Sequence, residues 1–144
     1  MNSRDDLARL VAQTDSRKVT RDRALRPIVR RTRGSPWIII RSAQFLGSVA
    51  AEHREEFDRS VDGPVRQQLL QFPGLRNLEI LRPIDKDAHA PPIYQIFNLV
   101  FADEAAMLSA LESPVRQRVH DAMVPILPLF DGNIVHYVRL ITGE

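Results

Sequence analysis

The apolar positions of residues 37–142 follow two periods, one typical of strands and one typical of helices. Runs rich in β-branched and aromatic residues predict strands at residues 37–45, 76–84, 93–101 and 133–141. Apolar residues spaced three or four apart predict helices over residues 48–71 and 103–126. The resulting order, β-α-β-β-α-β, is typical of an α+β, ferredoxin-like fold with a four-stranded antiparallel sheet.

Both predicted helices contain a proline. Gly63-Pro64 lies inside the first helix and Ser113-Pro114 inside the second. Because proline removes a backbone hydrogen bond and clashes with the preceding turn, each pair predicts a break, with the proline opening a new segment. Asp103 is placed to cap the helix that follows the third strand, and Asp131-Gly132 predicts a turn before the fourth.

Apolar residues fall on both faces of the predicted sheet. Alternation places Ile38 and Ile40 with Phe97, Leu99 and Phe101 under the helices. The opposite face then carries Trp37, Ile39, Arg41, Tyr94, Ile96, Asn98 and Val100. Large exposed apolar patches usually mark interfaces, and a symmetric pair is the commonest oligomer. We therefore expect a homodimer, packed sheet to sheet as a closed α+β barrel around an apolar cavity for a small molecule.

Charge divides the chain into two regions. Residues 1–36 carry ten basic and four acidic side chains, a net charge of +6, whereas residues 37–144 carry ten basic and fourteen acidic ones, a net charge of −4. The first region has few large apolar residues, which predicts a basic arm outside a folded domain at residues 37–144. No aromatic side chain is interleaved with the arginines to stack on bases. We therefore favour a solvated or partner-docked arm over nucleic-acid binding.

Several classes of site are excluded or not expected. The chain has no cysteine, which excludes disulfides, thiolate nucleophiles and cysteine-based zinc sites. Phosphate-binding glycine loops, Gly-x-Ser-x-Gly and His-Glu-x-x-His are missing, so neither a cofactor nor a metal is expected. His89 with Asp85 and Asp87 is interpreted as a solvated turn. With no long apolar run and no secretory signal, we expect a cytoplasmic protein that does not enter a membrane.

Three segments resemble one known family: EEFDRSVDGPV at residues 55–65, FPGLRNLEI at 72–80 and FADEAAMLSALESP at 101–114. They are similar to the EthD-like dimeric α+β barrel proteins, and to methylmuconolactone methylisomerases in particular, over residues 37–141. The resemblance implies a small-molecule-binding homodimer and, for an enzyme, cofactor-free isomerisation of a lactone or enol-like substrate. Members often carry His-x-Pro in the first helix, where this chain has Asp62-Gly63-Pro64.

Two residues are candidates for proton transfer. Asp62 occupies the position of the family's helical histidine and either acts as a base or caps the helix beside the proline. His136 lies in the last strand and either acts as an acid or base in the cavity or lies at a surface or subunit contact. Alternation places His136 opposite Tyr137, so only one of the two can line the cavity.

The candidate ligand-binding residues are Arg41, Asn98, Ile39, Ile96 and Tyr137. Arg41 interrupts the most apolar strand, where it would hold a ligand carboxylate, pair with Glu79 or a C-terminal acid, or lie where the strand frays. His53 and His120 lie on predicted helices among charged neighbours and are interpreted as surface residues. The alternative function is a non-catalytic dimeric binding or accessory protein, which the missing helical histidine favours.

Overall fold

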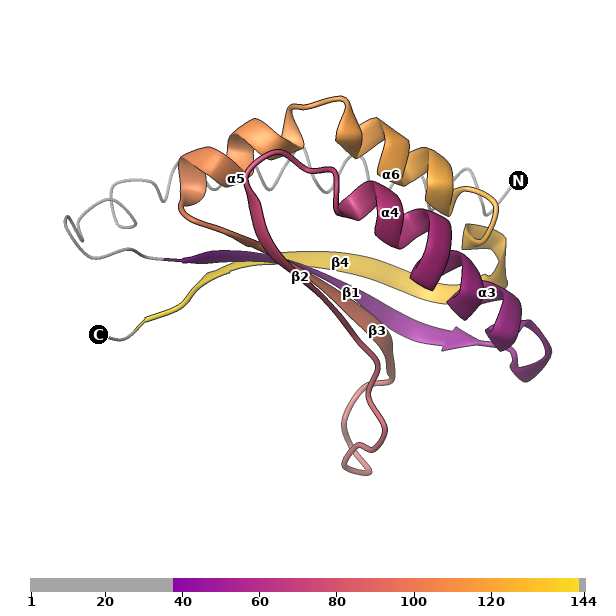
Figure 1. Cartoon of the computed structure of the whole chain (residues 1–144). Helices are drawn as coiled ribbons and strands as arrows, with labels where there is room; N and C mark the ends of the chain where they lie inside the picture. Colours follow the sequence, from indigo (N-terminus) through magenta and orange to yellow (C-terminus); the bar gives the residue numbers. More distant parts are fainter. Residues whose placement is uncertain (1–37, 143–144) are drawn as a thin grey trace.

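The computed structural model describes residues 38–142, in which helices pack on one face of a four-stranded antiparallel sheet (Figure 1). The strands are β1 (Ile39–Val49), β2 (Leu75–Leu81), β3 (Ile93–Phe101) and β4 (Phe130–Leu140). The helical segments are η1 (Ala51–His53), α3 (Arg54–Ser60), η2 (Val61–Val65), α4 (Arg66–Leu69), α5 (Glu104–Leu111), α6 (Val115–Met123) and η3 (Leu127–Leu129). The strand order β2-β3-β1-β4 confirms the predicted ferredoxin-like fold.

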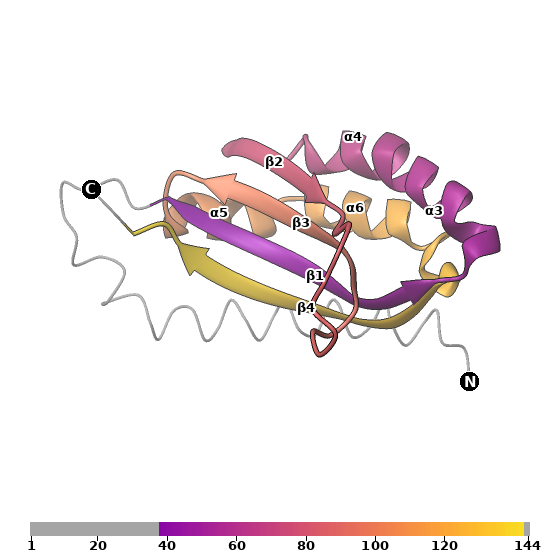
Figure 2. The same ribbon diagram turned by 90° about the horizontal axis from the view of Figure 1, so that it is seen from below.

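The predicted arm at residues 1–36, together with Trp37, lies outside the described residues. Within residues 38–142, no helix is long and apolar enough to cross a membrane. Figure 2 shows the sheet from the side that no described helix covers, with β1 between β3 and β4. We call this side the open face.

The prediction of which β1 side chains lie under the helices is wrong, because the alternation is shifted by one residue. Ile39 pairs with Phe101 and Arg41 pairs with Leu99, so both lie on the helix-covered face, whereas Ile40 lies on the open face. Ile39 and Arg41 are 1% and 3% exposed. Three consecutive isoleucines hide the alternation, so the sequence pattern of β1 does not identify its buried face.

Tyr94 was predicted on the open face and instead lies on the helix side. The register shifts opposite Phe45 and leaves Tyr94 as the extra residue of a β-bulge. Its ring packs edge-on against Phe57, with 5.4 Å between ring centroids, and its hydroxyl donates a 2.7 Å hydrogen bond to Asp58. Burial, together with this hydrogen bond, raises the pKa of Tyr94 to about 12.

The first helix does not break at Pro64. The chain stays helical from Arg54 to Leu69, with a π-helical turn at η2 that contains the proline. Proline has no N–H and its ring clashes with the carbonyl four residues earlier. A wider turn relieves this clash without ending the helix, so the proline is accommodated inside a single π-helical turn.

The cap and the break predicted for the second helix are confirmed. The Asp103 carboxylate accepts a 2.8 Å hydrogen bond from the Ala106 N–H at the start of α5. The helix then ends, and α6 begins after Ser113-Pro114, where the serine hydroxyl accepts a hydrogen bond from Val115 N–H. This separate segment lays α6 along the sheet, where it forms one wall of a pocket.

Asp131-Gly132 does not form the predicted turn, because both residues lie inside β4. Gly132 pairs with Gly47 of β1, and these glycines have φ angles of 153° and 149°. A Cβ atom on Gly132 would lie 2.0 Å from the Leu46 carbonyl oxygen, and one on Gly47 would lie 2.1 Å from the Asp131 carbonyl oxygen. The glycine pair therefore allows the two strands to approach closely and to continue past the predicted turn.

Candidate functional site

A pocket of about 440 Å³ lies between the helix-covered face of the sheet and α6. Ala43 of β1 forms part of its floor, between Arg41 and Phe45 on the same strand face. The small alanine leaves space that the surrounding larger side chains enclose. The apolar walls include Leu69, Phe72, Phe97, Leu111, Met123 and Ile134.

Two candidates from the sequence lie in this pocket together. His136 pairs with Ala43 across β1 and β4, which makes Arg41 its diagonal neighbour on the same face. Both side chains are buried, with 3% exposure for Arg41 and 8% for His136. Ala43 is too small to separate them, so a single small molecule over the pocket floor can contact both.

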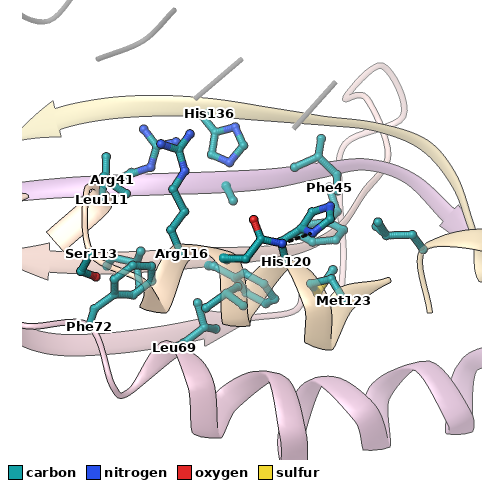
Figure 3. Close-up of a pocket in the computed structure, with 17 residues that line it drawn as sticks. Arg41, Phe45, Leu69, Phe72, Leu111, Ser113, Arg116, His120, Met123 and His136 are labelled. Carbon is teal, nitrogen blue, oxygen red and sulfur yellow. Dashed lines mark hydrogen bonds between the residues drawn. The ribbon is translucent and has the colours of Figure 1, made fainter. Parts of the chain in front are cut away.

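Arg116 brings a second guanidinium into the pocket from α6. Figure 3 shows Arg41 and Arg116 pointing toward the same end of the pocket, with His136 projecting toward that end from β4. Burial lowers the pKa of Arg116 below its ordinary value, as expected for a cation removed from water. Two guanidinium groups directed to one end of an apolar pocket favour a planar anion, because their N–H groups match carboxylate geometry.

His120 also lines the pocket, although the sequence was interpreted to place it on the surface. Its side chain is 31% exposed, and its Nδ1 lies 3.3 Å from the Gln117 amide nitrogen and 3.6 Å from a carboxylate oxygen of Asp121. Arg116 and His120 are four residues apart and border the apolar positions of α6. This spacing was the available signal that both lie at the edge of the buried side of α6.

Asp62 does not line the pocket. Its carboxylate accepts two hydrogen bonds from Arg82, at 3.0 Å and 3.3 Å, and Arg66 lies 3.8 Å away. These contacts join η2 to the segment that follows β2. A carboxylate held by two arginines outside the pocket is an ion-pair group, which argues against Asp62 as the proton-transfer residue.

The other predicted ligand-binding residues also lie outside the pocket. Ile39 is buried in the core, and Ile96, Asn98 and Tyr137 lie on the open face. The Asn98 amide accepts a 2.6 Å hydrogen bond from the Ser42 hydroxyl and donates a 3.0 Å hydrogen bond to Glu79. These three side chains connect β1, β3 and β2 on the open face. Arg41 lies on the other face, so the Arg41–Glu79 pair, which was one alternative from the sequence, does not form.

The pocket lies on the opposite side of the sheet from the predicted cavity. The prediction placed the cavity between two sheets, whereas this pocket lies beneath the helices of one chain. Among residues 38–142 there is no group of three or more histidine, aspartate and glutamate side chains that could hold a metal ion.

No protein-family model and no curated protein sequence matches the chain. Several solved structures match it. An EthD family protein from Bacillus halodurans superimposes with a TM-score of 0.60 and 11% identity, over 73% of this chain and 99% of that chain. A DABB family protein with a ferredoxin-like fold from Mesorhizobium loti gives 0.51 and 20%, over 74% and 99%.

A dimeric ferredoxin-like protein of unknown function from Thermobifida fusca gives a TM-score of 0.52 and 14% identity, over 74% of this chain and 93% of that chain. At these identities the similarity establishes the fold. The chain has the ferredoxin-like fold, and its resemblance to EthD-type proteins is confirmed at that level.

Proposed function

We propose that the pocket binds a small organic molecule that carries a carboxylate. The observation that carries this proposal is the convergence of Arg41 and Arg116 at one end of a pocket with mostly apolar walls. The guanidinium groups would hold the carboxylate, and the apolar walls would bury the organic part of the ligand. A small-molecule site lined by apolar side chains with a few convergent polar groups has this form.

Binding of benzoate tests this proposal. Benzoate offers a carboxylate on a flat apolar body, and benzamide has the same shape without the charge. We expect calorimetric titration to show benzoate binding at least about 10-fold more tightly, because a charge-assisted hydrogen bond contributes about 1.5–3 kcal/mol. Equal affinity for the two compounds would show that the pocket has no anion site.

We further propose that His136 moves a proton at a carbon beside a carbonyl group of the bound molecule. A buried histidine beside an anion site is placed to act as an acid or a base toward the bound molecule. The histidine would take a proton from that carbon, the C–H electrons would form a C=C bond, and the carbonyl π electrons would move onto oxygen. In a ligand with a C=C bond next to that carbon, the product is a dienolate, and return of the proton to its far carbon, with the electrons moving back from oxygen, would complete an isomerisation without a cofactor.

Deuterium exchange separates this enzyme from a protein that only binds its ligand. In heavy water, 4-acetylbenzoate should exchange its methyl protons faster in the presence of the protein, as followed by NMR. His136→Gln removes the base and should reduce the protein-dependent exchange rate by about 100-fold or more. Binding of the compound without protein-dependent exchange would favour the alternative, a non-catalytic binding protein.

We also propose that the chain forms a homodimer through the open face. That face carries half-buried apolar side chains, among them Ile40, Ile96, Val100 and Val135, and the Thermobifida fusca protein of the same fold is described as dimeric. Analytical ultracentrifugation should give a dimer for the wild type and a monomer for Val100→Glu. Leu70→Glu, at a 53% exposed position, should remain dimeric. A folded wild-type monomer at micromolar concentration would contradict the dimer.

A further inference from the structure

The hydrogen bonds along α6 fix the orientation of the Gln117 amide. Its nitrogen lies 2.8 Å from Oδ1 of Asp121. An ionised carboxylate can only accept hydrogen bonds, so the NH2 group of Gln117, and not its oxygen, must face Asp121. The amide orientation therefore follows from the chemistry of its partner.

The same NH2 group fixes the tautomer of His120. It lies 3.3 Å from Nδ1 of the ring, and an NH2 group can only donate. Nδ1 must therefore offer its lone pair, and the neutral ring must carry its proton on Nε2. The competing contact, from Nδ1 to the Asp121 carboxylate, is 3.6 Å long and exceeds hydrogen-bond distance.

The protonated nitrogen is the one available to a molecule in the pocket. Nδ1 is engaged with residues of its own helix, and Nε2 lies across the ring from it. The ring lines the pocket, and no hydrogen bond to Nε2 is found within residues 38–142. His120 therefore adds a neutral N–H donor to a pocket whose charged donors come from Arg41 and Arg116 (Figure 3).

We infer that His120 donates a hydrogen bond from Nε2 to a carbonyl or enolate oxygen of the ligand, with Gln117 as the positioning residue. The inference rests on the proposed function of the pocket and narrows its ligands to organic acids that carry a ketone, ester or lactone carbonyl besides the carboxylate. Negative charge develops on this oxygen when a proton leaves the adjacent carbon. A preorganised donor there stabilises the enolate without becoming charged itself.

The tautomer is measured first, without ligand, by NMR of protein containing 15N-labelled histidine. At a pH where His120 is neutral, we expect its Nε2 to be protonated and its Nδ1 to be unprotonated. His120→Phe identifies the signals by removing them. Gln117→Glu, a change at an exposed position, should move the proton to Nδ1, because a carboxylate accepts where the amide donated. An Nδ1-protonated ring in the wild type would overturn the inference.

Ligand contact is measured with two compounds of matched shape, 4-acetylbenzoate and 4-isopropylbenzoate. We expect the wild type to bind the acetyl compound about 3- to 10-fold more tightly, as one neutral hydrogen bond provides. His120→Phe and Gln117→Glu should lose this preference, and His120→Gln, whose amide can donate, should retain part of it. Tight binding of both compounds without preference overturns the role of His120 alone. Failure of both to bind overturns the proposed function and the inference together.

Discussion

Arg41→Met is expected to weaken benzoate binding by about 10- to 100-fold, because it removes a buried guanidinium from the end of the pocket that holds the carboxylate. Methionine keeps much of the apolar volume of the side chain, so the walls of the pocket should be retained. The loss should fall on benzoate and not on benzamide, which carries no charge. Calorimetric titration of both compounds measures this difference.

Two further variants make this result specific. Arg116→Met removes the second guanidinium from a half-buried position on α6 and should weaken benzoate by a similar factor. Arg139→Met removes an exposed arginine from the open face and should leave affinity unchanged. If Arg41→Met and Arg116→Met both stay folded and bind benzoate as tightly as the wild type, the two arginines do not form the anion site.

Gly132→Ala is expected to lower the free energy of unfolding by about 3 kcal/mol or more. The added Cβ would meet the Leu46 carbonyl oxygen at 2.0 Å, and the residue has a φ angle of 153°, where side chains are rarely tolerated. Relief requires β1 and β4 to separate at Gly47, with which Gly132 pairs. Urea denaturation followed by circular dichroism measures the change.

Gly63→Ala is the matched control for this substitution. Gly63 lies in the helical path, and an added Cβ would meet no atom within 4 Å apart from its chain neighbours and the backbone of its own helix. Alanine loses less conformational entropy than glycine in a helix, but a Cβ before Pro64 disfavours the helical conformation, so the two effects oppose each other and this variant should stay within about 1 kcal/mol of the wild type. A Gly132→Ala protein within about 0.5 kcal/mol of the wild type would show that the glycine pair does not constrain the strands.

The order of elements was predictable from sequence because it depends on local signals. Strand and helix periods differ, and Asp103 and Ser113-Pro114 mark helix ends with side chains that satisfy backbone groups nearby. The wrong prediction of a turn at residues 131–132 has a different cause, a contact between residues distant in sequence. Asp131-Gly132 is typical of a turn, and only the pairing of Gly132 with Gly47 shows why the strand continues.

The site was predictable only in part. Arg41 and His136 were recognisable as polar groups in apolar strands, but the registers of β1 with β3 and β4 decide that both lie under the helices. The run of isoleucines before Arg41 concealed which face of β1 lies under the helices. His120 was set aside because its sequence neighbours are charged, although its position one turn after Arg116 places both at the pocket. Strand pairing and helix placement decide which candidate residues lie together in the pocket.

We place the ligand site beneath the helices and not between two sheets. Intermolecular NOEs from the ring protons of bound benzoate to protein methyl groups test it most directly. We expect contacts to Leu111, Val119, Met123 and Ile134, which line the pocket. Contacts to Ile96, Val100 and Val135 on the open face instead would contradict it.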